Sequence, residues 1–378
     1  MLIELIYRHT ALYVLNSRLF STGIATLMSF TLAMALLPFY IGFLRKYNLS
    51  SEFQSRDRPV EPVMPAGILF LVIVAVTSAV TVRINSYVIS GLIIYIFFGI
   101  IGAVDDIAKV VNKRKVQQGK LSRHDFQYKA DGISSSLRLA LYIGISLLVA
   151  LLAYEYIPNI NGTINLPFFS ILKKYPYMPF WIFIPFMTLT IAVLANGVNF
   201  TDGFDTLATV PSITCLLFVG LISFISSNST WSTYLLIPHI IGLQELLPLI
   251  GAVIGTLLAY LWFNSPPSTI IMGDSGAVGL GGLIGILFVF TKAGFFLPIV
   301  GFVFLLEFVS VFIQIGYYKL TKKRFFLMAP IHHHFHKKME KSGRYSDGFQ
   351  IKSKIMWRFH ILSVLLLVFG LVIFLKVR

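Results

Sequence analysis

Stretches of about 20 apolar residues recur along the chain, and they leave it few ways to fold. A helix needs about 20 such residues to cross the hydrocarbon core of a bilayer, where it satisfies its own backbone polar groups. We therefore predict an all-α polytopic membrane protein with about ten transmembrane helices. The predicted spans lie near 22–44, 66–83, 86–104, 137–157, 178–198, 207–227, 246–263, 276–293, 295–318 and 356–375.

The low charge content excludes a soluble globular protein. Only 12% of the 378 residues are charged and 56% are hydrophobic, whereas a soluble domain has about 25% charged residues. No polar stretch is long enough for a separate domain, so residues 1–378 are treated as one integral membrane domain. The single cysteine, Cys215, lies in an apolar stretch, which excludes a disulfide scaffold. We expect membrane lipids, and no nucleic acid, among the partners.

The distribution of Lys and Arg predicts which side each loop faces. Ten spans place both termini on one side, and residues 1–21 are expected to form an amphipathic interfacial segment there rather than a secretory signal. Segments 45–65, 105–136 and 319–355 carry 4, 7 and 10 Lys/Arg, whereas the opposite side carries 8. Because cytoplasmic loops are enriched in these residues, we expect the three segments in the cytoplasm and both termini outside.

Four polar patches lie where apolar stretches end, all on the predicted cytoplasmic side. Three contain Asp105-Asp106, Asp202 with Asp205, and Asp274, which are five of only 16 acidic residues. Carboxylates at membrane depth are costly and persist where they meet water, a metal or a substrate. Adjacent carboxylates such as Asp105 and Asp106 also repel, so at least one needs a cation or a raised pKa. The patches therefore predict a single active site at one membrane face.

Two acidic patches carry further polar groups. The helix expected after Asp274 opens with glycines, so its backbone N–H groups could bind phosphate beside a cation held by the carboxylate. Asp202 and Asp205 are three residues apart and would share one face of a helical turn, with Asn196 and Asn199 nearby. The alternatives are that the glycines only pack helices and that the Asn and Asp residues only cap them.

The fourth patch places His332, His333 and His334 in a row after Pro330. Neighbours on a helix diverge by about 100°, so we expect the histidines in a loop or short turn, pointing in several directions. No Cys or carboxylate stands at zinc-binding spacing, which favours hydrogen bonds to phosphate; a basic interfacial loop is the alternative. Several Asp residues and few soft ligands together indicate Mg²⁺-dependent phosphoryl transfer, with a lipid phosphate as one reactant.

These motifs resemble those of the polyprenyl-phosphate N-acetylhexosamine-1-phosphate transferases. The resemblance covers roughly residues 90–375, and its most specific part is the Ala-Pro-Ile-His-His-His-Phe string at 329–335. Glu307 and the segment 310–314 also match the family's ninth helix. The other matching strings are Asp105-Asp106, Asn196-Gly-Val-Asn-Phe-Thr-Asp-Gly-Phe-Asp205, Leu261-Trp-Phe-Asn264 and Met272-Gly-Asp-Ser-Gly276.

The resemblance implies a multi-pass transferase of peptidoglycan synthesis in the bacterial inner membrane. It would move phospho-MurNAc-pentapeptide from UDP-MurNAc-pentapeptide to undecaprenyl phosphate, giving UMP and lipid I, with Mg²⁺ as cofactor; a homodimer is left open. Asp105, Asp106 and Asp274 would be catalytic, with Asp105 the candidate base and Asp274 the Mg²⁺ ligand. The implied substrate-binding residues are Asn196, Asn199, Asp202, Asp205, Asn264, His332, His333, His334 and Arg138.

The chain departs from the family pattern at several positions, which bear on substrate choice and rate rather than on reaction class. Arginine keeps the charge of lysine but not its compact ammonium. The departures are Arg58 and Arg138 where the family has Lys, Pro65-Ala66 at a glycine pair, Thr206 at a Gly and His336 at a Glu.

Two other functions remain as alternatives. A sister transferase would use UDP-GlcNAc or another UDP-sugar, but the histidine string argues against it. An ion-coupled transporter would hold acids near the bilayer midplane and show internal repeats. Here the acids gather at helix ends, and the sequence shows no repeat.

Overall fold

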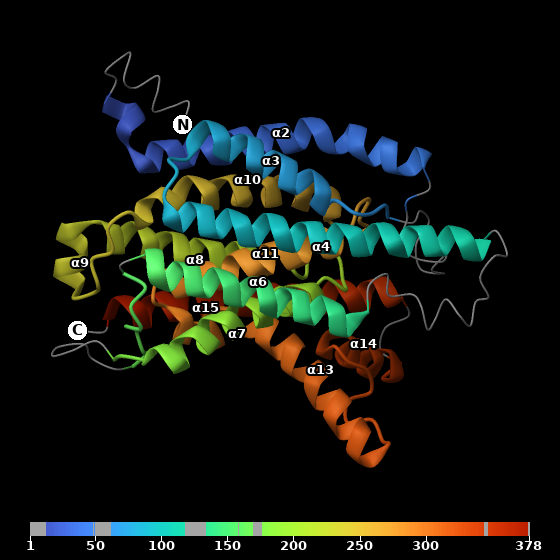
Figure 1. The fold of residues 1–378 in the computed structure, drawn as a ribbon. Coiled ribbons are helices and arrows are strands. Elements are labelled where there is room, and N and C mark those ends of the chain that lie inside the picture. Colours follow the sequence, from blue (N-terminus) through green and yellow to red (C-terminus); the bar gives the residue numbers. More distant parts are fainter. Residues whose placement is uncertain are drawn as a thin grey trace.

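The computed structural model describes residues 13–47, 49, 62–117, 134–157, 159–168, 176–343 and 347–376. Over these residues the fold is a bundle of helices, with two isolated β-bridges and no strand (Figure 1). The long helices are α2 (Arg18–Lys46), α3 (Gly67–Thr81), α4 (Ser86–Gln117), α6 (Ser135–Tyr156), α7 (Phe180–Thr201), α8 (Thr209–Ser227), α10 (Leu246–Asn264), α11 (Gly273–Phe290), α13 (Phe302–Thr321) and α15 (Gly348–Lys376). Shorter helical segments are η1 (Tyr13–Asn16), α9 (Ser229–Leu235), η2 (Leu243–Glu245), η3 (Gly294–Phe296), α12 (Leu297–Val300) and α14 (Ile331–Lys341).

The prediction of a polytopic all-α membrane protein is confirmed. In the described part of the chain, nine helices are long and apolar enough to cross a membrane. The second predicted span, near 66–83, corresponds to α3, which has only 15 residues and would extend about 22 Å. It is short because the chain before it is extended: the N–H groups of Val63 and Ala66 donate to the carbonyls of Thr269 and Ile271.

The ninth predicted span is wrong as a single helix over 295–318. The chain forms η3 and the four-residue α12, turns at Gly301, and only then enters α13, which runs on to Thr321. Pro298, in the first turn of α12, has no N–H to extend a helix from the preceding segment. After this turn α13 leaves the bundle at a steep angle, and only 22% of its span is buried (Figure 1).

The centre of the bundle is α11, whose span is 94% buried. Its glycines allow neighbouring backbones to come close, as one of the two interpretations of this segment predicted. A Cβ at Gly279 would lie 2.9 Å from the carbonyl oxygen of Tyr95 on α4, and one at Gly281 would lie 2.8 Å from the Cα of Ala195 on α7. This packing brings the first turn of α11 against both α4 and α7, where the polar patches lie.

The two ends of the bundle differ. The start of α2 and the end of α15 lie at one end, and α14 and the extension of α4 lie at the other (Figure 1). Which side of the membrane each end faces stays a prediction. The expected interfacial segment at residues 1–21 falls largely outside the described residues, which begin here with η1 at Tyr13.

Candidate active site

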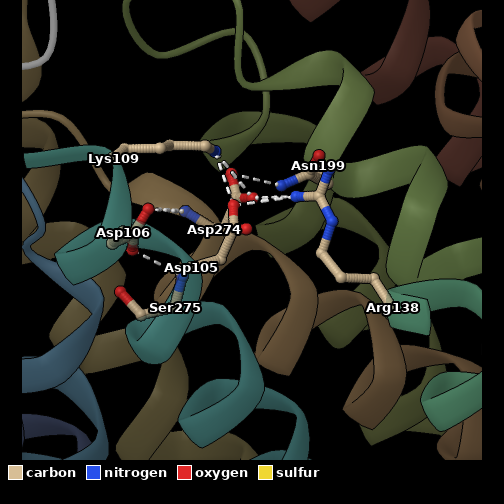
Figure 2. Close-up of polar contacts among 7 residues, drawn as sticks. All are labelled: Asp105, Asp106, Lys109, Arg138, Asn199, Asp274 and Ser275. Carbon is tan, nitrogen blue, oxygen red and sulfur yellow. Dashed lines mark hydrogen bonds and ion pairs between the residues drawn. The ribbon is translucent and has the colours of Figure 1, made fainter. Parts of the chain in front are cut away.

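Three helices and the start of a fourth bring the acidic patches together. Asp105 and Asp106 come from α4, Asp274 from the first turn of α11, and Asn199 from the last turn of α7. Figure 2 shows these side chains converging with Lys109 of α4 and Arg138 of α6. The predicted convergence of residues 105, 106, 199 and 274 is therefore present in the structure.

Asp106 caps the N-terminus of α11. Its Oδ1 accepts a hydrogen bond from the backbone N–H of Asp274 at 3.0 Å, and its Oδ2 accepts one from that of Ser275 at 2.9 Å. Asp106 is fully buried, and a helix N-terminus stabilises a negative charge. Gly273 makes room, because it has φ +76° and a Cβ there would lie 2.7 Å from Oδ2 of Asp106. Asp106 therefore positions Asp274.

Asp105 and Asp274 share two cations. The Nη1 of Arg138 lies 2.8 Å from an oxygen of each carboxylate, and the Nζ of Lys109 lies 2.8 Å from Asp105 and 2.9 Å from Asp274 (Figure 2). The Oδ1 of Asp274 accepts a further hydrogen bond from the amide of Asn199 at 2.9 Å. Two negative and two positive charges thus balance at a site where the Asp105 side chain is fully buried.

Lys109 is a site residue that the sequence analysis missed. It stands four residues after Asp105 on α4, where a helix places side chains on one face, and the two side chains form an ion pair. An Asp followed by a Lys at this spacing was the available signal.

Asp202 lies beside this cluster and has no ion-pair partner among the described residues. It follows the last residue of α7, so the expectation of a helical turn through 202–205 is wrong: the chain turns here because the helix ends at Thr201. Burial, followed by the negative charges of Asp274 and Asp106, raises the pKa of the Asp202 carboxyl well above its usual range.

Asp205 and Asn264 hold the loop after α7 in place. The Oδ1 of Asp205 accepts a hydrogen bond from the Ser268 hydroxyl at 2.8 Å. The Oδ1 of Asn264 accepts the N–H of Thr206 at 2.7 Å, and its amide donates to the carbonyl of Ile270 at 2.9 Å. Asn264 is only 2% exposed, so its polar atoms are used within the protein. These contacts join the loop after α7 to the loop before α11.

Among the described residues, Thr206 and Asn196 make hydrogen bonds or close contacts within the protein rather than with the carboxylates. Thr206, at a usual glycine of the family pattern, has φ +60°, a region that favours glycine. Its carbonyl oxygen lies 3.1 Å from Nε2 of His360 on α15. Asn196 donates its side-chain amide to the carbonyl of Ala192 on its own helix, and no described contact joins it to the carboxylates. Arg58 lies outside the described residues.

The three consecutive histidines lie on a helix, which corrects the expectation of a loop. Pro330 precedes the first turn of α14, where a missing N–H costs nothing. The side chains diverge as predicted. His332 is fully buried, with its Nδ1 3.1 Å from Oε2 of Glu307 on α13, out of line for a hydrogen bond. His334 turns away and accepts the N–H of Leu327 at 3.1 Å.

The middle histidine faces the loop after α7. The ring of Phe204 lies 4.6 Å from that of His332, 5.2 Å from that of His333 and 5.8 Å from that of His336. Burial and the neighbouring His332 and His336 lower the pKa of His333 to about 3, so its ring is neutral near pH 7. A neutral imidazole can donate one hydrogen bond and accept another.

The carboxylates fit Mg²⁺ better than they fit a metal held by protein alone. Among the described residues, no group of three or more His, Cys, Asp or Glu side chains is placed to hold an ion. Mg²⁺ is commonly bound by one or two carboxylates, with waters and substrate phosphates completing its shell. The side chain of Asp274 is 14% exposed, and Asp105 lies beside it and shares the same two cations. These two carboxylates are hard oxygen donors and therefore match that pattern.

The part of the chain that is similar to known proteins includes the helices that form the site. A family model described as glycosyl transferase family 4 matches residues 88–292, which contain all five acidic site residues. The chain is 38% identical over 352 residues to the phospho-N-acetylmuramoyl-pentapeptide-transferase of a Nitratiruptor species, covering 91% of each chain. Proteins with the same name from Campylobacter curvus (33% identical, 91% of each chain) and Bartonella quintana (40%, 76% of this chain and 72% of the relative) are also similar.

The capping role of Asp106 predicts a stability effect. Asp106→Asn should lower the free energy of unfolding by about 1–3 kcal/mol, because an amide N–H would face a backbone donor. The matched control is Ser275→Ala, which keeps the backbone N–H and removes a hydroxyl that makes no hydrogen bond; it should change little. Thermal unfolding in detergent measures both. Equal effects of the two substitutions would contradict the capping role.

The environment of His333 predicts a pH dependence. Because its pKa is lower in the folded protein (about 3) than the ordinary value of about 6.5, the unfolded chain takes up the proton first, and stability falls as pH drops below about 6.5. His333→Gln should therefore lose about 1 kcal/mol less stability than wild type between pH 7 and 5, after allowance for partial exposure. His239→Gln, at an exposed position, is the control. Parallel pH curves for wild type and His333→Gln would contradict the assignment.

Proposed function

Because the chain belongs to glycosyl transferase family 4, we propose that it transfers phospho-MurNAc-pentapeptide from UDP-MurNAc-pentapeptide to undecaprenyl phosphate. The relatives that share about nine-tenths of its length carry the name of this transferase. The observation that best supports the proposal is the cluster of Asp105, Asp274, Lys109 and Arg138 at one end of the membrane helices. There a lipid phosphate from the bilayer and a nucleotide from the aqueous phase can meet.

The proposed reaction exchanges one diphosphate (P–O–P) linkage for another. An oxygen of the lipid phosphate attacks the phosphorus next to the sugar, and a new P–O bond forms. The bond from that phosphorus to the bridging oxygen of the donor breaks, and UMP leaves with the electron pair. The second product is lipid I. Such transfers depend mainly on positioning and on stabilising the charge of the phosphoryl oxygens.

Lys109 and Arg138 suit this charge stabilisation. Both side chains present N–H donors at the centre of the site. Lys109 belongs to α4, which also carries Asp105, and Arg138 belongs to α6, which begins beside these carboxylates. Arg138 can contact two phosphate oxygens at once, and Lys109 acts as a compact point charge.

Asp105 and Asp202 suit the handling of protons. Asp105 would accept the proton of a lipid phosphate, or orient that phosphate, once a cation no longer engages its oxygen. The pKa of Asp202 is raised by burial, which favours its neutral form, and a neutral carboxyl could donate a hydrogen bond to an anionic oxygen without repelling it. The two acids therefore differ in their surroundings: of the pair, Asp105 is the one with described cationic partners.

Mg²⁺, when bound, would neutralise charge on the diphosphate and polarise the bond that breaks. Asp274 would hold it together with Asp105. Asn199 orients Asp274 through the hydrogen bond to its Oδ1, and Asp106 fixes the backbone on which Asp274 stands.

We place the site at the cytoplasmic face of the bacterial inner membrane. The basic residues of the three segments support this orientation, since the end of α2, the end of α4 and α14 all lie at the same end of the bundle (Figure 1). A nucleotide donor made in the cytoplasm would reach the site from that side.

A transfer assay with purified protein tests the function. UDP-MurNAc-pentapeptide should give UMP and lipid I with undecaprenyl phosphate and Mg²⁺, and UDP-GlcNAc should not replace it. Asp274→Asn should lower turnover on the order of a thousandfold, since a catalytic metal contributes several kcal/mol. Glu340→Gln on the exposed part of α14 is the matched charge control. Equal use of UDP-GlcNAc would favour the sister activity, and active Asp274→Asn would exclude the metal role.

The orientation makes a separate prediction. A cysteine at Lys341, in a Cys215→Ala background, should resist a membrane-impermeant thiol reagent in intact cells and react once the cells are opened. Ready labelling in intact cells would reverse the orientation and move the site to the outer face.

A further inference from the structure

Lys109 and Arg138 are held by the very oxygens that a divalent cation would need. Each of the two cationic nitrogens lies within 2.9 Å of Oδ2 of Asp105 and of Oδ2 of Asp274. Two carboxylate oxygens and two nitrogens thus lie together with alternating charge (Figure 2). A dication between the same oxygens would replace two unit charges with equal total charge.

We propose that Lys109 and Arg138 are exchangeable counter-ions, which neutralise the metal-binding carboxylates before substrate arrives and move to the substrate's phosphates when the metal enters. The inference rests on the proposed function, because it assigns the cations two partners in turn. It also makes them determinants of metal affinity: in the substrate-free protein they compete with the metal, and in the complex they bind the anions that accompany it.

The exposure of the four side chains supports an exchange. The carboxylates are the fixed partners, since the side chains of Asp105 and Asp274 are 0% and 14% exposed. The cations are more exposed, at 29% for Lys109 and 17% for Arg138. Both cations stand on long side chains with several rotatable bonds, so they can turn toward an arriving anion while the shorter acids stay in place.

Burial gives the exchange an energetic reason. Removing the partner of a buried charge without replacement is strongly unfavourable, so the two cations cannot leave the carboxylates unless another positive charge arrives. Likewise a metal binds more weakly while both cations stay, because like charges only a few ångström apart repel. Substrate phosphates that attract the cations would therefore favour metal binding, and the metal would favour phosphate binding.

In a contrasting account, the four charged groups form permanent ion pairs whose only role is to hold α4, α6 and α11 together. The two accounts differ in what happens when one positive charge is removed. If the ion pairs are purely structural, the contact between the helices would weaken, and metal binding would be unchanged or poorer. Counter-ions that compete with the metal would, when removed, leave a carboxylate oxygen free for it.

Binding of Mn²⁺ to the purified protein without substrates, followed by electron paramagnetic resonance, distinguishes them. Lys109→Met and Arg138→Gln should each bind Mn²⁺ more tightly, on the order of tenfold, as a repelling unit charge is removed at close range. Lys109→Arg and Arg138→Lys keep the charge and should resemble wild type. Lys115→Met removes the same charge farther along α4, at an exposed position, and should have no effect. Asp274→Asn should abolish the binding, which identifies the site.

The second half of the exchange is measured with UDP in the presence of saturating Mn²⁺. Lys109→Met and Arg138→Gln should weaken UDP binding by about tenfold, because a charged hydrogen bond to phosphate is lost. Opposite changes in Mn²⁺ and UDP affinity are the expected signature. Unchanged or weaker Mn²⁺ binding in both variants, or no Mn²⁺ binding by wild type, would overturn the proposal. Neither readout uses the peptide-bearing donor or the lipid, so a different donor preference would revise the proposed function alone.

Discussion

The hydrogen bonds from the first turn of α11 to Asp106 are the contact on which the site depends. They fix where the most buried helix of the bundle begins, and with it the position of Asp274. They also resolve the conflict between two adjacent carboxylates. Neighbouring residues on a helix point about 100° apart, so Asp106 faces backbone N–H groups while Asp105 faces Lys109 and Arg138. Each negative charge has its own positive partner.

Length and apolarity were sufficient to predict most of the fold, because a bilayer span is set by those two properties. The exceptions arise where tertiary contacts replace helical turns. α3 is short because the extended chain before it, at Val63 and Ala66, pairs with the loop before α11. The ninth span breaks at Gly301, because apolarity alone did not weigh Pro298 and the glycine, which interrupt the helix there. α14 is a helix although its three histidines looked suited to a loop, because divergent directions are compatible with packing on three different neighbours.

The sequence also predicted which motifs meet, but not how their atoms are used. Apolar runs ending in polar residues place Asp105, Asn199 and Asp274 at one end of the bundle, and the structure brings them into contact. Hydrogen-bond partners depend on distant loops, so sequence could not show that Asn264 and Asp205 hold backbone and Ser268 in place. Nor could it separate the capping carboxylate from its neighbour, since the two stand side by side in the chain.

Charge balance connects this geometry to the order of events at the site. In the substrate-free site, Lys109 and Arg138 balance the charges of the carboxylates of Asp105 and Asp274. A diphosphate and a lipid phosphate then bring several negative charges, which cannot be accommodated at low dielectric without added positive charge. Cation release, metal entry and phosphate binding are therefore coupled steps rather than independent ones. The guanidinium of Arg138 adds a geometric condition that a lysine would not, because its planar fork must match the phosphate oxygens as well as their charge.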